Sequence, residues 1–330
     1  MKKPLVSVII PAYNAAPHIV QTINSVLEQT YKQLEIIVVD DGSTDDTLVK
    51  LQQLDSEKIK VLPQANRGAS SAKQLGLENA CGDFIQYLDA DDLLSTNKIE
   101  VQVEELLKQP HQVAICSTVH FDNGQDHLMQ QPSAYEDAFL YSTADVAAFL
   151  INLWGGNGKG GSMIQPNAFL IPISVAKAAG PWDTKLSPCP DEDGEYFCRV
   201  LLSSKGIRYT DGVLNYYRKF PNKKSLSSLK SHQSLVNSYQ SVVSKKNWLF
   251  KHNDGEKAKL AIARQLISVA IDAYPSYFSL YKKIHNEVKS LGKYSYAPIS
   301  GGPVTRKLST TVGWKFARLF QYYLDKTRIP

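Results

Sequence analysis

Two groups of aspartates directly follow apolar runs of the sequence, and these are the residues best placed to do chemistry. Segments 40–41 and 89–92 follow residues 34–39 and 84–88. Both runs have the length and β-rich composition of buried strands. Because no Lys or Arg lies within either group, the carboxylates would repel one another unless a cation or a ligand hydrogen-bond donor compensates. The sequence therefore predicts a site for a divalent metal and a nucleotide.

The elements that would position these acids alternate between strand and helix through residues 1–118. The pattern predicts strands at 5–10, 34–39, 59–62, 84–88 and 113–117, with helices at 19–27, 44–54, 69–80 and 96–110 between them. Such alternation indicates an α/β fold with a mainly parallel sheet flanked by helices. Ligands bind beyond the carboxyl ends of the strands in these sheets, where both acidic groups are expected.

The rest of the chain has a different pattern. Residues 119–225 are less regular, and residues 226–330 are helical with apolar stripes and a basic flank near the end. The middle segment predicts helices at 143–153 and 172–179, a glycine-rich loop at 155–161 and a strand at 168–171. For the last stripe, packing onto the preceding domain is the expectation. A surface-lying amphipathic helix at the membrane is the alternative.

Composition limits the classes of function. A length of 330 residues allows one large or two modest domains, and a hydrophobic fraction of 43% fits a folded protein. A net charge of +5, without a basic stripe along the chain, argues against a nucleic-acid partner. The first apolar run is too short for a signal peptide or a membrane span, so we expect a cytoplasmic protein. Four cysteines without CxxC spacing, and no HExxH pair, argue against a disulfide framework and a zinc site.

Three motifs follow one another in the first hundred residues: VSVIIPAYN at 6–14, VDDGSTD at 39–45 and YLDADD at 87–92. In this order they resemble the motifs of family 2 glycosyltransferases, and weaker matches continue to about residue 220. The resemblance implies the GT-A fold and a bacterial enzyme of surface-glycan synthesis. It also implies three parts: a nucleotide-sugar-binding half at 1–118, an acceptor-binding half at 119–225 and a helical C-terminal extension at 226–330.

The resemblance also implies which residues bind the donor. Asp91 resembles the metal-binding acid of the family's DxD element, and the metal would be Mn²⁺ or Mg²⁺. Asp41 would accept a hydrogen bond from the base. The implied nucleotide contacts are Pro11, Tyr13, Asn14, Asp41, Arg67, Lys73 and Asp89. Residues 73–74 are Lys-Gln where the family usually has Arg-Asn.

An acceptor hydroxyl has a pKa far above neutrality, so its attack on a sugar needs a positioned base. Asp193 matches the second acid of the family's Glu-Asp pair and is the predicted base. Glu192, Arg218 and Trp182 are further candidates for contacts with the acceptor or the phosphates. By resemblance, the reaction is a single displacement with inversion and without a covalent sugar intermediate.

Other interpretations remain open from the sequence. Asp-Gly-Ser-Thr alone also makes a turn and a helix cap, and acids at 191–195 also complement a helix dipole. The GxGxxG pattern at 156–161 follows a helical segment, so an acceptor lid or a plain surface loop fits better than a dinucleotide site. At the level of the whole protein, the alternatives are a catalytically silent nucleotide-sugar-binding protein and a nucleotidyltransferase.

The sequence therefore predicts a metal-dependent glycosyltransferase that moves a sugar from a UDP-sugar to a hydroxyl of a glycan or a lipid-linked acceptor. Its location would be cytoplasmic. Peripheral contact with the inner face of the plasma membrane is retained as an alternative for the C-terminal helices.

Overall fold

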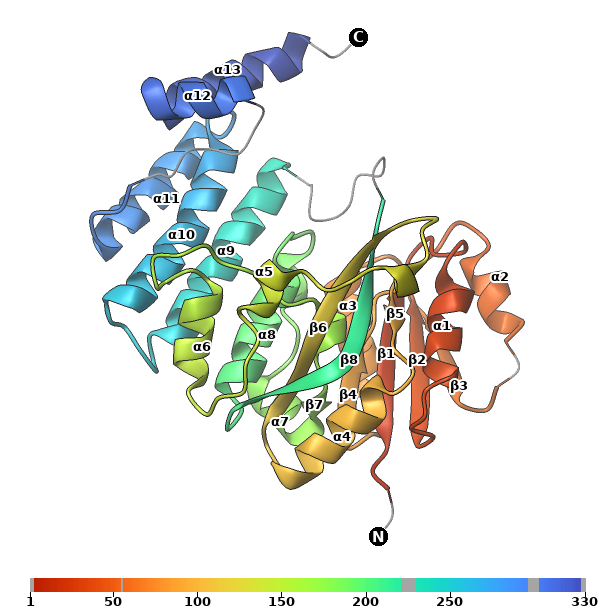
Figure 1. Cartoon of the computed structure of the whole chain (residues 1–330). Helices are drawn as coiled ribbons and strands as arrows, with labels where there is room; N and C mark the ends of the chain where they lie inside the picture. The colour runs from red at the N-terminus through yellow and green to blue at the C-terminus, as the bar shows by residue number, and fades with distance from the viewer. Residues whose placement is uncertain (1–2, 55, 221–229, 296–302, 328–330) are drawn as a thin grey trace.

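An α/β domain followed by a group of helices makes up the computed structural model, which describes residues 3–54, 56–220, 230–295 and 303–327 (Figure 1). In Figure 1 the parallel strands of the main sheet run upward from the N-terminus, so that their carboxyl ends lie toward the top of the view, where the last helices also stand.

The main sheet has the strand order β3-β2-β1-β4-β7. The first four strands of that order are parallel, and β7 pairs with β4 in the antiparallel direction. The bounds are β1 (Val6–Ala12), β2 (Leu34–Asp40), β3 (Ile59–Pro63), β4 (Phe84–Tyr87) and β7 (Ile171–Pro172). The predicted mixed, mainly parallel sheet is confirmed.

Helices cover both faces of this sheet because its strands are apolar on both sides. Val8 and Ile10 of β1 pack in one core with residues of α1 and α4. On the other face, α3 comes close to the strands because Gly76 has no side chain. A Cβ atom there would lie 2.3 Å from the Cγ2 of Ile9. The helices are α1 (Ile19–Leu27), α2 (Thr47–Gln52), α3 (Ala69–Glu78) and α4 (Lys98–Lys108).

A second sheet, of order β5-β8-β6, extends the domain. Its strands are β5 (Leu93–Leu94), β6 (Val113–Asp122) and β8 (Ile207–Lys219), and β8 runs parallel to β6 and antiparallel to β5. The helices of this half are α5 (Ala134–Asp137), α6 (Val146–Leu153), α7 (Ile173–Ala179) and α8 (Glu192–Leu202). The predicted strand at 168–171 is wrong in extent: a 3₁₀ turn occupies Pro166–Ala168, and only Ile171–Pro172 joins the sheet.

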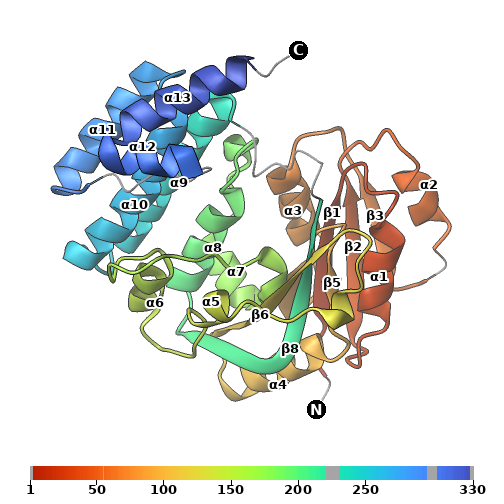
Figure 2. The ribbon, with the colours of Figure 1, turned by 45° about the horizontal axis from the view of Figure 1, so that its top comes forward.

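The C-terminal helices form a bundle beside the α/β domain (Figure 2). They are α9 (His232–Leu249), α10 (Glu256–Ala273), α11 (Phe278–Leu291), α12 (Pro303–Thr311) and α13 (Trp314–Thr327). Tyr281, Ile284 and Val288, which recur at helical spacing along α11, lie in the bundle core. Val312 and Phe316 of the last stripe are 60% and 50% exposed, so that stripe is only partly packed. Within the described residues, no helix has the length and apolar character needed to cross a bilayer.

Candidate active site

The first two motifs meet at the carboxyl ends of β1 and β2. Asn14 has a left-handed backbone (φ 49°), and its N–H donates to Ser43 Oγ at 3.0 Å. Its side-chain oxygen in turn accepts from the Thr44 N–H at 2.8 Å. Asn14 therefore joins the two motif loops, while Pro11 remains half-buried and Tyr13 is 51% exposed beside them. This geometry suits loops that line a ligand.

Asp41 organises the next loop of the site. Its carboxylate accepts hydrogen bonds from Gln64 Nε2 (2.7 Å), the Arg67 N–H (2.8 Å) and the Gly68 N–H (2.9 Å), and the residue is 4% exposed. The neighbouring Asp40 has a buried Oδ1 that finds no hydrogen-bond partner in the described part of the chain. Asp41 thus holds the loop that carries Arg67, whose side chain is exposed. The predicted contact of Asp41 with a base stays a prediction.

The third motif is fixed by its last acid. Asp92 is fully buried and accepts hydrogen bonds from Asn167 Nδ2 (3.0 Å) and the Arg218 N–H (2.8 Å). The Arg218 guanidinium donates to the Asp91 carbonyl at 2.8 Å and to Gln21 Oε1 at 2.7 Å. Asp92 and Arg218 therefore shape the loop that presents Asp91. A phosphate contact by this guanidinium would require some of these bonds to break.

A buried lysine connects the third motif to the predicted base. The Lys73 ammonium, 2% exposed, forms an ion pair with the carboxylate of Asp193, which lies 120 residues away in sequence. The same ammonium lies 3.9 Å from Asp89 Oδ1. Lys73 is therefore placed among carboxylates, and the structure brings the donor-side acid and the predicted base to one point. Its predicted nucleotide contact remains untested.

Glu192, the residue before the predicted base, has an unusual environment. It is 3% exposed, and neither carboxylate oxygen has a hydrogen-bond partner among the described residues. Burial raises the pKa of Glu192 to about 7; Lys73 opposes this shift and the Asp193 charge adds to it. Desolvation likewise raises the pKa of Asp89 to about 6, again opposed by Lys73 and assisted by Asp193. The site thus carries more negative charge than its lysine balances.

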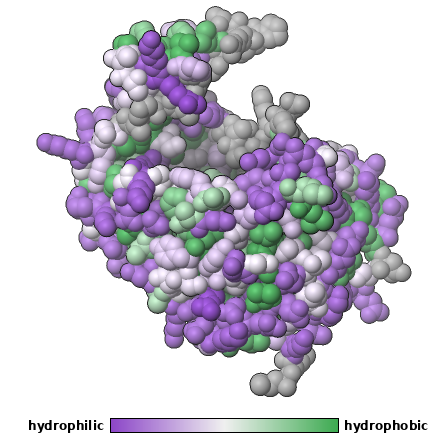
Figure 3. All heavy atoms as spheres, viewed as in Figure 1, coloured by the Kyte–Doolittle hydropathy of each residue, from purple (hydrophilic) through white to green (hydrophobic). Residues whose placement is uncertain are grey.

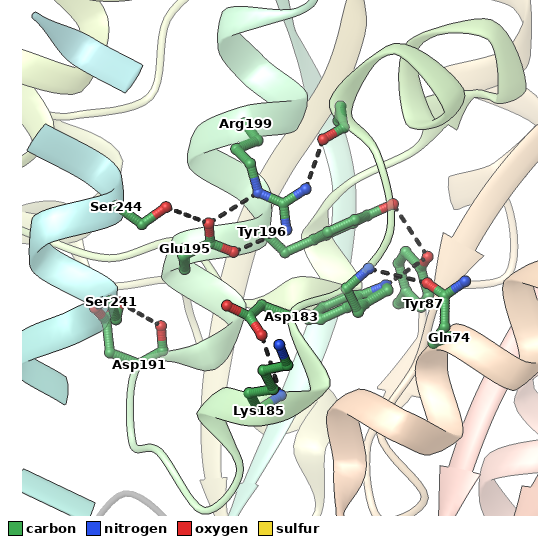
Figure 4. A network of polar contacts seen from close by, with 12 residues as sticks. Gln74, Tyr87, Asp183, Lys185, Asp191, Glu195, Tyr196, Arg199, Ser241 and Ser244 are labelled. Atoms are coloured by element: carbon green, nitrogen blue, oxygen red, sulfur yellow. Dashed lines mark hydrogen bonds and ion pairs between the residues drawn. The ribbon is translucent and has the colours of Figure 1, made fainter. Parts of the chain in front are cut away.

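Trp182 lies in the core beside this lysine, and its predicted contact with the acceptor or the phosphates stays a prediction. It is 3% exposed, stacks on Tyr196 with ring centroids 3.9 Å apart, and donates its indole N–H to Tyr87 Oη at 2.9 Å. Figure 4 shows the polar contacts around these rings. The Lys73 ammonium lies 5.0 Å from the indole centroid, so Trp182 forms the apolar wall behind the lysine.

Comparison with known proteins identifies the architecture around this site. Residues 7–159 match the sequence family described as Glycosyl transferase family 2. The chain contains a family 2 glycosyltransferase domain. The structure of S. aureus TarS residues 1–349 in complex with UDP-GlcNAc superposes with a TM-score of 0.59, at 16% identity, over 90% of this chain and 95% of that one. The GT-A fold is therefore confirmed.

Curated relatives of this family 2 domain are bacterial proteins. An uncharacterized glycosyltransferase of Nostoc sp. is 35% identical over 45% of this chain and 47% of its own length. The E. coli protein WfgD, named UDP-Glc:alpha-D-GlcNAc-diphosphoundecaprenol beta-1,3-glucosyltransferase, is 43% identical over 32% of this chain and 42% of its own length. The chain thus spans less than half the length of these relatives.

The acids of the family 2 domain fit a divalent cation in one particular way. No group of three ligating side chains occurs within the described ranges, so the protein alone does not form a closed metal cage. However, Asp89 and Asp91 supply hard carboxylate oxygens, and burial together with the charges of Asp193 and Asp91 raises the pKa of Asp89. Mg²⁺ commonly binds one or two carboxylates and takes its other ligands from substrate phosphates and water. The donor set fits such an arrangement.

Sequence reasoning missed the residues that hold the site together. Gln64 and Asn167 bond Asp41 and Asp92, and Ser241 and Lys245 bond Asp191. The glycine-rich loop at 156–161 contacts the helical extension, since Arg264 donates to the Gly158 carbonyl at 3.0 Å. The contacts of Ser241 and Lys245 become evident only from the burial of these two polar side chains, which the structure shows. In the sequence they do not stand out, because serine and lysine are ordinary surface residues of helices.

Proposed function

We propose that this protein transfers a sugar from a UDP-sugar to a hydroxyl group of a glycan or a lipid-linked acceptor, with inversion at the anomeric carbon. The observation that supports it most is the shared lysine. Lys73 lies against both Asp89, from the end of a central strand, and Asp193, from the start of α8. A donor-side acid and a potential proton acceptor thus meet at one place, as a single displacement requires.

On the donor side, the protein would position the leaving group. Tyr13 and the loop fixed by Asn14 would line the nucleoside, and the exposed Arg67 would approach the diphosphate. Asp91, with Asp89 beside it, would hold Mn²⁺ or Mg²⁺. When bound, such an ion neutralises the charge that develops on a departing diphosphate.

On the acceptor side, Asp193 would take the proton of the attacking hydroxyl. Its side chain is 36% exposed, so a hydroxyl can reach it, and the ion pair with Lys73 fixes its direction. A carboxylate base in this position typically contributes about 10²- to 10⁴-fold to the rate. The hydroxyl oxygen bonds to the anomeric carbon as the bond to the diphosphate breaks, which inverts the configuration.

The C-terminal end of the protein supports an acceptor at a membrane surface. Residues 303–330 contain six Lys or Arg and one acid, so they carry the whole formal net charge of +5. Exposed apolar side chains lie among these charges, including Val304, Val312 and Phe316. Figure 3 shows hydrophobic and hydrophilic atoms side by side over α12 and α13. We propose that these helices lie on an anionic lipid surface at the inner face of the plasma membrane.

The deciding experiment is the substitution Asp193→Asn. We expect it to reduce transfer from UDP-glucose or UDP-GlcNAc at least about 100-fold, because the base is lost. UDP affinity with Mn²⁺, measured by calorimetry, should stay within about twofold. Asp183→Asn is the control, since that carboxylate accepts from the Lys185 N–H in the 3₁₀ turn before α8. Full transfer by Asp193→Asn would overturn the proposed base. UDP binding with no transfer by the unmodified protein, across nucleotide sugars and acceptors, would favour the binding-protein alternative.

A further inference from the structure

The helix α9, which follows the catalytic domain in sequence, makes direct contacts with the segment that carries the proposed base. Lys245 of α9 is 3% exposed and forms an ion pair with Asp191. Ser241 Oγ, one helical turn earlier, donates to Asp191 Oδ2 at 2.6 Å (Figure 4). Asp191 immediately precedes α8 and lies two residues before Asp193. Its position therefore determines how the first turn of α8 begins.

The Asp191 carboxylate lies close against the first turn of α8. A Cβ atom on Gly194 would lie 2.2 Å from Asp191 Oδ1. A side chain at position 194, directly after Asp193, would therefore clash with this carboxylate, and glycine permits the approach.

Two more hydrogen bonds join α9 to the segment around α8. Ser244 Oγ donates to Glu195 Oε1 at 2.7 Å, and Asn237 Nδ2 donates to the Leu186 carbonyl at 2.7 Å. These residues, together with Ser241 and Lys245, recur at spacings of three and four, so they form one face of α9. The whole of that face is used to hold residues 186–195. A helix that only covered an apolar core would not need four polar side chains in this position.

We propose that α9 is part of the catalytic machinery and that Lys245 is a positioning residue for Asp193, acting through Asp191. The inference depends on the proposed function of Asp193. Two buried lysines then hold the first turn of α8 from two sides. Lys73, on α3, bonds Asp193 itself, and Lys245, on α9, bonds Asp191. The position of the base therefore depends on α9 of the helical extension as well as on α3 of the α/β domain.

The test replaces Lys245 by Met and compares it with the same change at the next residue. Lys246 points to α11, where it pairs with Glu287, so Lys246→Met removes a part-buried ion pair of the same helix without contact to Asp191. We expect Lys245→Met to lower kcat by about 10- to 100-fold, since small misplacements of a catalytic group have effects of this size. KM for the UDP-sugar and the Kd of UDP should stay within about twofold. Lys246→Met should leave kcat within about twofold.

Loss of folding is separated from loss of positioning by two further measurements. Lys245→Arg keeps a cation and is expected to recover most of kcat, and Tm is measured for every variant. The inference is overturned if Lys245→Met lowers kcat no more than Lys246→Met at temperatures where both are folded. It is also overturned if donor KM rises as much as kcat falls. If Asp193→Asn keeps full activity, the proposed base itself is wrong, whatever Lys245 does.

Discussion

Two acids of the site are held by different kinds of contact: Asp41 at the carboxyl edge of the sheet, and Asp191 beside the helical extension. Asp41, at the end of β2, is bound mainly by backbone N–H groups of a loop 26 and 27 residues further along the chain. Asp191 is bound by the side chains of Ser241 and Lys245, 50 and 54 residues away. The first arrangement depends on the path of the backbone, and the second depends on the identity of two side chains.

This difference has consequences for how each side of the site can change. Every amino acid except proline offers a backbone N–H, so the loop around Asp41 keeps its donors when its side chains vary. Each of the two side-chain contacts with Asp191 disappears with a single substitution on α9. The nucleotide side of the site should therefore depend on Asp41 itself, whereas the acceptor side should depend on its distant partners.

Asp41→Ala is the strongest test of that contrast. It removes the acceptor of two backbone N–H groups and of Gln64 Nε2, so we expect a loss of about 4 kcal/mol in the free energy of unfolding. UDP affinity should fall as well, because the loop carrying Arg67 loses its anchor. Urea denaturation and calorimetry measure the two effects.

The neighbouring Asp46→Ala provides the control for this substitution. The Asp46 side chain makes no capping hydrogen bond at the start of α2, and its loss should change stability by less than about 0.5 kcal/mol. If Asp41→Ala is no more destabilising than Asp46→Ala, the loop does not depend on the carboxylate, and the contrast between the two sides disappears.

Much of the nucleotide side could be predicted from the sequence because its information is local. The apolar runs before Asp40 and Asp89 are strands, and parallel strands place their carboxyl ends together. The helix that starts at residue 69 was also predicted from its pattern. For these elements, a short segment determines both the structure and the place of its acids.

The acceptor side could not be predicted in the same way. The pairing of Lys73 with Asp193 joins positions 120 residues apart, and periodicity carries no information about such a contact. β8 was not predicted, although it runs over Ile207–Lys219, because its pattern of buried residues is interrupted at Asp211 and Gly212. The place of Trp182 between Tyr87 and Tyr196 is likewise decided by tertiary packing.

A second prediction concerns Glu192 on the acceptor side, because burial of its carboxylate lowers the stability of the folded protein at high pH. Its pKa is raised to about 7 from an ordinary value of 4.5, so the folded protein holds a proton that the unfolded chain releases between these pH values. Stability from this group therefore falls as pH rises from about 4.5 to 7. Glu192→Gln should remove the penalty and stabilise the protein above pH 7 by up to about 3 kcal/mol, with little effect near pH 4.

Urea denaturation at pH 5 and pH 8 checks this sign. Glu195→Gln is the matched comparison on the same helix, because Glu195 is paired with Arg199 and accepts from Ser244. That variant should lose stability at both pH values. Equal stability changes for Glu192→Gln at pH 5 and pH 8 would show that the buried carboxyl does not titrate as described.

The smallest expected effect concerns membrane binding and tests the difference in net charge between the last helices and the rest of the chain. Residues 1–302 are formally neutral, and the whole net charge of +5 lies in residues 303–330. Lys307→Ala with Lys315→Ala should weaken binding to vesicles of phosphatidylcholine and phosphatidylglycerol by about 2 kcal/mol, roughly 30-fold, because each surface cation contributes about 1 kcal/mol.

Binding is measured by co-sedimentation at low and high salt, and vesicles of phosphatidylcholine alone serve as the uncharged surface. The control is Lys177→Ala with Lys185→Ala, which removes the same charge from exposed positions of the α/β domain. If both pairs weaken binding equally, attraction depends on net charge alone and α12 and α13 are not the contact. If only the first pair does, α12 and α13 are the part of the protein that contacts the lipid.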